Sequence, residues 1–119
     1  MSFQDIEYEV VNRVARITTA RPKYRNAQSR RLLEELDQAF ATAATDQDVH
    51  VIALFGQGEH FSGGHDLGTP EEREDMQKRP LQEGLRGKFD HSREQFVEKS
   101  MRWRNVPKPT IAGLSLIHI

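Results

Sequence analysis

Cysteine is absent from the 119 residues of this sequence. Its absence excludes disulfide bonds, catalytic thiolates and zinc sites built on thiolates. A chain without cysteine suits a reducing compartment, so we expect a cytoplasmic location. At this length we expect one domain and no second one.

Long apolar runs are lacking as well. The longest, Val49–Phe55, includes His50 and is far shorter than the roughly 20 apolar residues that cross a bilayer. The first segment, Met1–Val11, alternates acidic and apolar residues, whereas a secretory signal has a basic stretch followed by an apolar one. These patterns predict a soluble protein with no membrane partner.

Net charge is close to zero. The 17 Lys and Arg residues are balanced by 18 Asp and Glu residues, giving a formal net charge of −1. Binding to nucleic acid or to an anionic membrane usually needs a strong basic excess, so neither partner is expected. A few local basic groups could still hold one small phosphate-bearing ligand.

The first elements predicted are two strands that form a hairpin. Apolar residues alternate along Ile6–Val11, and Val14–Thr19 again has the composition of a strand after the short Asn12-Arg13 connection. Pro22 ends the second strand because proline lacks the amide donor that a sheet requires. A loop is expected to continue through Asn26.

A helix and a third strand follow. From Ser29 onward, apolar residues recur at steps of three and four, which predicts a helix that ends at Asp46–Asp48. The apolar run Val49–Phe55 then fits a strand buried on both faces. Strand, helix and strand at this spacing predict a right-handed crossover between parallel strands, and hence an α/β fold.

The second half of the sequence is more polar. Gly56–Gly68 contains five of the eight glycines, which indicates a backbone with special conformations. Thr69–Lys88 is charged and interrupted by prolines, so we expect a mobile or weakly helical insertion there.

A last helix and the start of a strand are expected near the C-terminus. Asp90 or Ser92 could cap this helix, and the prolines at 107 and 109 end it. Trp103, on this helix, is expected to pack in the core or at a subunit interface. Thr110–Ala112 has the composition of a strand that is just beginning.

Two familiar ligand-binding loops do not fit the glycine-rich segment. A dinucleotide-binding G-x-G-x-x-G pattern starting at Gly56 has Phe61 in its third glycine position, and a P-loop has Gly64 where its lysine should be. The remaining possibilities are a purely structural turn, or a loop whose main-chain amides approach a ligand and stabilise negative charge on its carbonyl oxygen. Composition alone leaves both open.

Three motifs resemble those of the enoyl-CoA hydratase/isomerase (crotonase) family. Phe61–Leu67, Phe-Ser-Gly-Gly-His-Asp-Leu, is similar to the family signature F-[S/A]-[A/G]-G-x-D-[L/I]. Upstream, Ala20–Ala27 resembles L-N-R-P-x-x-x-N-A, although Ala20 replaces a common asparagine. Downstream, Trp103–Ala112 resembles the x-P-K-P-x-I-A segment. The motifs occur in the family order across residues 5–112.

The resemblance implies a fold and a ligand. The fold would be a crotonase-like α/β spiral of ββα units, truncated after the first half of the core, with residues 1–113 as the N-terminal part of this domain. The family acts on CoA thioesters without a separate cofactor or metal, and its members assemble as trimers or hexamers. We therefore expect an acyl-CoA thioester as partner and a homotrimer or homohexamer as the parent assembly.

The resemblance also implies site residues. The main-chain amide of His65, just before the signature aspartate, corresponds to one donor of the oxyanion hole. The residues implied near the CoA adenine and phosphates are Lys23, Tyr24, Arg25 and Ala27. Those implied along the pantetheine and thioester are Gly63, Gly64, Asp66, Leu67 and Gly68.

Two other readings of this loop have little support. His60 and His65, with Glu59 and Asp66, could suggest a metal site, but two histidines five residues apart on a loop are a weak signal, and no metal is predicted. Ser62 and His65 are too close in sequence to imply the geometry of a Ser-His-Asp triad.

Family hydratases use one or two glutamates located beyond the strand that begins at Thr110. We therefore expect the parent protein to be a hydratase-like lyase or an isomerase, and this chain itself to be inactive. Other reactions of the family, including thioester hydrolysis, remain open, as does a non-enzymatic piece that associates with other subunits. Residues 114–119, Leu-Ser-Leu-Ile-His-Ile, depart from the family and equal the translation of a transposase end used as a sequencing adaptor, which predicts a non-native tail.

Overall fold

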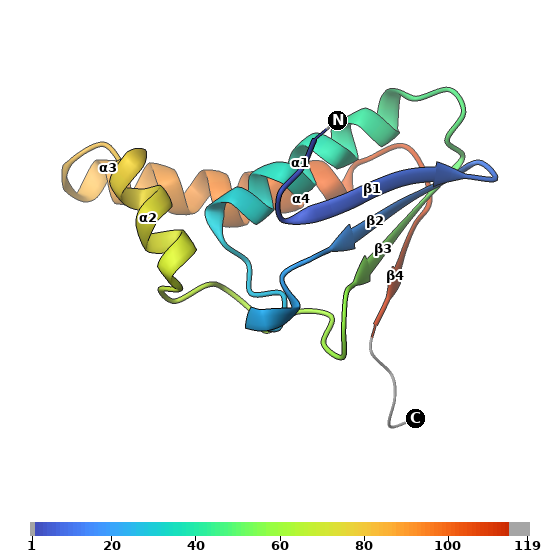
Figure 1. Ribbon diagram of the computed structural model, residues 1–119. Coiled ribbons are helices and arrows are strands. Elements are labelled where there is room, and N and C mark those ends of the chain that lie inside the picture. Colours follow the sequence, from blue (N-terminus) through green and yellow to red (C-terminus); the bar gives the residue numbers. More distant parts are fainter. Residues whose placement is uncertain (1, 115–119) are drawn as a thin grey trace.

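The computed structural model describes residues 2–114 as one sheet with helices on one side (Figure 1). The sheet has four strands in the order β1-β2-β3-β4. No helix within residues 2–114 has both the length and the apolar character that a membrane span requires. Of the predicted tail at 114–119, only Leu114 belongs to the described residues.

The predicted hairpin is confirmed. Strand β1 (Ile6–Val11) pairs antiparallel with β2 (Val14–Thr19), with Tyr8 opposite Ile17. Asn12 and Arg13, which connect the strands, have φ values of 51° and 69°. Positive φ at both central positions characterises the tight turns that match the twist of a hairpin.

Helix α1 (Arg30–Thr45) covers one face of the sheet and forms the core with it. The helix begins where the side chain of Ser29 accepts a hydrogen bond from the amide of Leu32 at 3.1 Å. Its apolar stripe packs against the inward residues of the strands. The buried core consists of Ile6, Ala15, Ile17, Leu32, Leu33, Leu36, Ala39, Phe40, Ala43, Val49 and Ile52.

Strand β3 (Val51–Gly56) lies parallel to β2, as predicted, but begins two residues later than expected. Ile52 is fully buried beneath α1, whereas Val51 and Phe55 on the opposite face are only half-buried. Ala53, on the same face as Val51 and Phe55, is 8% exposed. The prediction of a strand buried on both faces is therefore only partly confirmed for residues 2–114, in which no second layer covers that face. Strand β4 (Thr110–Gly113) pairs parallel with β3.

The segment predicted as a mobile or weakly helical insertion forms regular helix. Helix α2 (Pro70–Lys78) begins at Thr69, whose side chain accepts a hydrogen bond from the amide of Glu72. Arg30 holds α2 against α1 through a 2.9 Å hydrogen bond to the Asp75 carboxylate and a 2.8 Å bond to the carbonyl of Arg79. The ion pairs explain why so polar a segment packs on the core.

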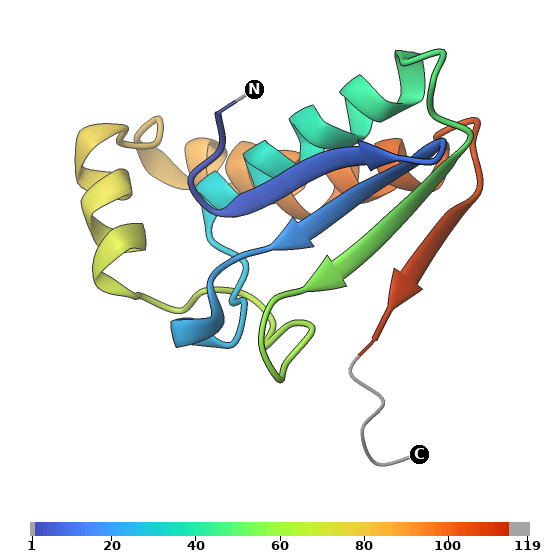
Figure 2. The same ribbon diagram turned by 45° about the vertical axis from the view of Figure 1, so that its right-hand side comes forward.

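The C-terminal helix starts earlier than predicted. Helix α3 (Gly84–Ser92), the π-helical turn η2 (Arg93–Glu98) and α4 (Lys99–Arg104) form one long rod beside α1 (Figures 1 and 2). Asp90 and Ser92 lie within the rod, so the prediction that either caps the helix is wrong. Trp103 stacks on Phe40 with ring centroids 5.3 Å apart, which confirms its expected packing in the core.

Candidate functional site

Two loops meet at the edge of the sheet where the parallel strands β2 and β3 end (Figure 2). The first loop follows β2 and contains the short 3-10 helix η1 (Pro22–Tyr24). The second is the glycine-rich loop that follows β3 and leads to α2. In open α/β sheets, ligands bind beyond the carboxyl ends of the strands, so this junction is the candidate site.

Asn26 connects the two loops through hydrogen bonds of its side chain. Its side-chain nitrogen donates to the carbonyl of Gln57 at 3.0 Å and to that of His60 at 2.6 Å. Its side-chain oxygen accepts from the amide of Arg21 at 2.9 Å. Asn26 is 1% exposed and has a φ of 56°, a left-handed conformation that asparagine tolerates better than most residues. The sequence pattern did not indicate this role, although Asn26 belongs to the segment Ala20–Ala27 that resembles a family motif.

A buried ion pair makes a second link. Arg21 donates to the Asp66 carboxylate at 3.0 Å, and their side chains are 5% and 0% exposed. Asp66 also accepts from the amides of Gly68 and Thr69 and from the Thr69 hydroxyl. Burial acts to raise the pKa of Asp66, but the donors from Thr69, Gly68 and Arg21 together lower it below its ordinary value. The carboxylate is thus ionised and fully engaged within the chain.

A parallel β-bridge between His65 and Gln28 connects the glycine-rich loop to the first loop. Gln28 donates its amide to the carbonyl of Gly64 at 2.7 Å, and its carbonyl accepts from the amide of Asp66 at 3.0 Å. In such a parallel bridge, the residue between the two bonded groups directs its own amide to the opposite side. The His65 amide therefore points away from Gln28, and it has no hydrogen-bond acceptor within residues 2–114.

The glycines before His65 make this approach of the loops possible. Gly63 donates its amide to the carbonyl of Arg25 at 2.7 Å, and a Cβ atom at Gly63 would lie only 3.3 Å from both this carbonyl oxygen and the Cβ of Arg25. Gly64 has a φ of 94°, which L side chains rarely adopt. These two glycines shape the loop and line neither pocket described below, unlike the other residues implied at the ligand.

A pocket of about 500 Å³ lies between the two loops. It brings together the remaining predicted residues from both motifs: Lys23, Tyr24, Arg25, Ala27, His65, Asp66, Leu67 and Gly68. Leu67 is 96% exposed, so its apolar side chain is available to a ligand. The Asp66 side chain is turned into the Arg21 network, which leaves its backbone to face the pocket.

Basic and acidic groups both border this pocket. The ammonium group of Lys23 lies 5.3 Å from the centre of the Tyr24 ring, and the Arg21 guanidinium lies 5.0 Å from it. The neighbouring Tyr24 hydroxyl, then its own backbone amide, and lastly the charges of Lys23 and Arg21 lower the pKa of Glu71. Glu71 is therefore a carboxylate beside the basic loop, where it opposes the attraction of an anionic ligand.

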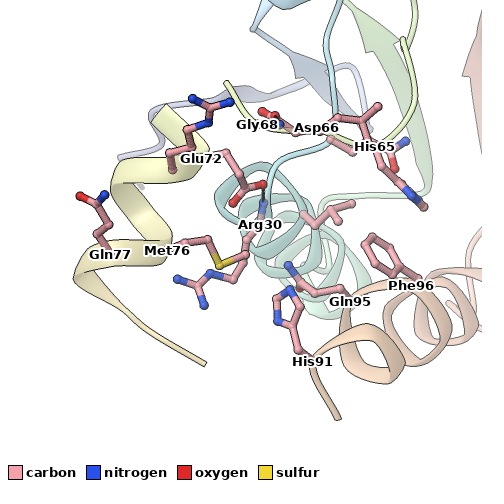
Figure 3. A pocket seen from close by; sticks show the side chains of 14 residues that line it. Arg30, His65, Asp66, Gly68, Glu72, Met76, Gln77, His91, Gln95 and Phe96 are labelled. Carbon is pink, nitrogen blue, oxygen red and sulfur yellow. Dashed lines mark hydrogen bonds between the residues drawn. The ribbon is translucent and has the colours of Figure 1, made fainter. Parts of the chain in front are cut away.

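A second pocket of about 580 Å³ lies on the other side of residues 65–68, between α1, α2 and the long rod (Figure 3). His65 stacks on Phe96 at 4.1 Å between ring centroids and thereby forms part of its wall. The side chains of Glu72, His91 and Gln95 also line it. Composition and periodicity do not indicate this pocket, because its walls come from segments far apart in the chain: the loop at Gln28, α1, residues 65–68, α2 and the rod.

No group of three or more His, Asp or Glu side chains among residues 2–114 is arranged to hold a metal ion. Asp66 would be its strongest ligand, but its carboxylate already accepts four internal hydrogen-bond donors.

Comparison with known proteins adds to this geometry. The sequence model of the enoyl-CoA hydratase/isomerase family matches residues 9–115. The chain is 37% identical over 123 aligned residues to the enoyl-CoA hydratase EchA13 of Mycobacterium tuberculosis, covering 92% of this chain and 39% of that protein. It is 40% identical to a probable enoyl-CoA hydratase from Mycobacterium smegmatis, whose crystal structure matches with a TM-score of 0.78 over 96% of this chain and 41% of that one.

A third relative carries the name of the predicted fold family. An enoyl-CoA hydratase/isomerase (crotonase) from Legionella pneumophila is 29% identical, with a TM-score of 0.77 over 95% of this chain and 40% of its own. The chain thus spans about 40% of the length of the relatives it matches. These matches confirm the predicted crotonase-like α/β fold, truncated after the first half of its core. The chain belongs to the enoyl-CoA hydratase/isomerase family.

Proposed function

We propose that the protein to which this chain belongs binds an acyl-CoA thioester, and that the His65 amide stabilises negative charge on the thioester oxygen. The orientation of this amide supports the proposal best. It points away from the Gln28 bridge, has no acceptor within residues 2–114, and belongs to a residue that lines both pockets. A fixed main-chain donor aimed at a developing oxyanion typically lowers a barrier by about 3 kcal/mol.

The nucleotide end of CoA would occupy the pocket between the loops. Lys23 and Arg25 supply cationic groups for its phosphates, and the Tyr24 ring offers a face beside the adenine. Leu67 and Gly68 would follow the pantetheine. Gly63 and Gly64 would act through the shape of the loop, while Asp66 would contribute its backbone only, since Arg21 holds its side chain.

The reaction would be that of a hydratase-like lyase or an isomerase, as in fatty acid metabolism, performed in the cytoplasm by a trimer or hexamer. Glutamates that this chain does not contain would move the proton or deliver the water. Residues 1–119 alone would therefore bind CoA without turning over a thioester. Normal hydratase turnover by this chain alone would contradict this part of the proposal.

Calorimetric titration of the 119-residue chain with free CoA tests the binding. We expect saturable binding that weakens about tenfold in a Lys23→Ala, Arg25→Ala double variant and weakens further at high salt. An Arg86→Ala, Lys88→Ala double variant is the matched control, since both are exposed cations on α3, away from either loop. Absence of CoA binding by a folded chain, or equal losses in the control and in the first double variant, would overturn the proposal.

One observation favours a second candidate, a piece that only associates with other subunits. The outer face of the rod exposes apolar side chains, including Phe89, Val97 and Met101, at 60%, 56% and 45% exposure. Such a surface promotes association in water. This candidate predicts concentration-dependent oligomers in light scattering with no CoA affinity, whereas the proposed function requires CoA affinity.

A further inference from the structure

The two pockets are joined along one short segment. His65, Asp66, Leu67 and Gly68 line both of them. A ligand that lies along this segment therefore reaches from the basic pocket, past the His65 amide, into the second pocket. If the proposed function holds, the nucleotide occupies the basic side and the acyl group enters the pocket beyond His65.

The second pocket is not uniformly apolar. Leu33, Met76 and Phe96 contribute carbon surface, but Glu72, His91 and Gln95 place polar groups among them (Figure 3). Gln95 is 4% exposed. Burial, followed by the positive charges of Arg30 and Lys99, lowers the pKa of His91, which favours its neutral form.

Glu72 differs from the other polar groups in its hydrogen bonding. Its Oε2 atom accepts a hydrogen bond from the amide of Arg30 at 2.9 Å, but its Oε1 atom is buried without a partner among the described residues. A buried carboxyl oxygen without a donor destabilises a protein because it has lost its hydrogen bonds to water. Burial also raises the pKa of Glu72.

The beginning of α2 explains why Glu72 is available. Thr69 and Glu72 have the spacing of a capping box, in which the glutamate would accept a hydrogen bond from the Thr69 amide. Here Asp66 accepts that hydrogen bond instead, at 2.8 Å. Because Asp66 has taken this place, the Glu72 side chain turns to Arg30 and the pocket. The unpartnered Glu72 Oε1 atom is therefore a consequence of the hydrogen bonds that Asp66 makes in the loop.

We infer that this pocket selects acyl groups that carry a hydroxyl group, which pairs with Glu72 Oε1. A hydroxyl both donates and accepts, so it can pair with the carboxyl whether or not the carboxyl is protonated. A purely aliphatic chain would fill the pocket and leave Glu72 Oε1 without a partner. Sites built around such polar groups discriminate strongly against ligands that lack the matching group.

The test compares thioesters that differ by one hydroxyl. The affinities of the 119-residue chain for 4-hydroxybutyryl-CoA and 6-hydroxyhexanoyl-CoA are measured by calorimetry beside those for butyryl-CoA and hexanoyl-CoA. We expect at least one hydroxylated ligand to bind about tenfold or more tightly than its counterpart. If CoA itself binds but neither hydroxylated thioester binds more tightly than its counterpart, the inferred selection for a hydroxyl group is contradicted and the proposed function is not. If CoA does not bind at all, the proposed function falls with it.

Variants of Glu72 assign the preference to its carboxyl group. Glu72→Met should reduce the preference to within about twofold, with the affinity of the variant for free CoA measured beside it. Glu72→Gln, which keeps an oxygen for the Arg30 amide and can still pair with a hydroxyl, should retain most of it. Glu74→Met is the control, because Glu74 lies on α2 and pairs with Lys78 in solvent. A hydroxyl preference that survives Glu72→Met would overturn the role of Glu72.

Discussion

Arg21 and Asp66 form an ion pair of 3.0 Å in which neither side chain is more than 5% exposed. The pair joins the loop after β2 to the loop after β3, and these loops carry the candidate site. Arg21 also donates to the carbonyl of Ala27 and to the hydroxyl of Thr69. Removal of one member would leave the other as an uncompensated buried charge, so the geometry of the site depends on both.

Replacement of Asp66 should therefore destabilise the fold. We expect Asp66→Ala to lower the free energy of unfolding by about 3 kcal/mol or more, because Arg21 and the amides of Gly68 and Thr69 lose their acceptor. Urea denaturation followed by circular dichroism measures the change. Asp48→Ala, at an ion pair exposed to solvent, should change it by less than about 1 kcal/mol. Similar effects of the two replacements would contradict the structural role.

The same carboxylate should make stability depend on pH. Because the folded pKa of Asp66 is lowered, its stabilising contribution is present above the ordinary pKa of about 3.9 and is lost as pH falls through the folded value. Urea titrations at steps from neutral pH down to about pH 2 should show a steep acid loss in the wild type. In Asp66→Asn, the unfolding free energy should fall less steeply at acid pH. An unchanged slope would show that other carboxylates cause the acid loss of stability.

Local patterns were sufficient to predict much of the fold. Alternation of apolar residues predicted the observed bounds of β1, strand-like composition predicted those of β2, and the helical period of apolar residues located α1. The segment after Thr69 was misjudged because its helix is stabilised by distant ion pairs, such as that between Arg30 and Asp75, which composition does not reveal. A local signal did exist, since Thr69-Pro70 followed by Glu72 is a capping sequence.

The site was predictable only in outline. The family motifs predicted that Lys23, Tyr24 and Arg25 lie near the same ligand as residues 65–68, and these residues line one pocket in the structure. The direction of the Asp66 side chain was not predictable, since it depends on Arg21, which is 45 residues away in the sequence. Glu72 lies in the charged segment Thr69–Lys88, and the burial of its Oε1 atom could not be predicted because it depends on how α2 packs against α1.

Asn26 offers a test of how the two loops are joined. Asn26→Gly keeps a residue that adopts positive φ but loses three hydrogen bonds, whereas Asn26→Ala loses the bonds and also strains the backbone. We expect losses in unfolding free energy of about 2 and 3 kcal/mol, respectively. Asn12→Gly, at another positive φ in the hairpin turn, is the control and should be nearly neutral. An Ala variant as stable as the Gly variant would exclude the backbone contribution.

Charge at the basic pocket can be tuned through Glu71. This carboxylate lies next to Tyr24 and Lys23, so it should repel the phosphates of CoA. We expect Glu71→Gln to raise the affinity for CoA about two- to fivefold at low salt, an effect that shrinks as salt is added. Calorimetry at two ionic strengths measures it, with Glu74→Gln as the control on the same helix. Unchanged or weaker binding would show that the phosphates lie elsewhere.

The role proposed for His65 belongs to its main-chain amide and not to its imidazole. In a full-length protein that contains this segment, His65→Ala should therefore keep thioester turnover within about tenfold, since only the stacking on Phe96 is lost. His65→Pro removes the amide hydrogen and should reduce kcat by about 100- to 1000-fold. The Gln28 bridge uses the groups of Gly64 and Asp66, so it does not depend on that hydrogen. Thermal unfolding and CoA affinity of each variant separate this effect from misfolding. A large loss in His65→Ala with unchanged CoA binding would instead assign the chemistry to the imidazole.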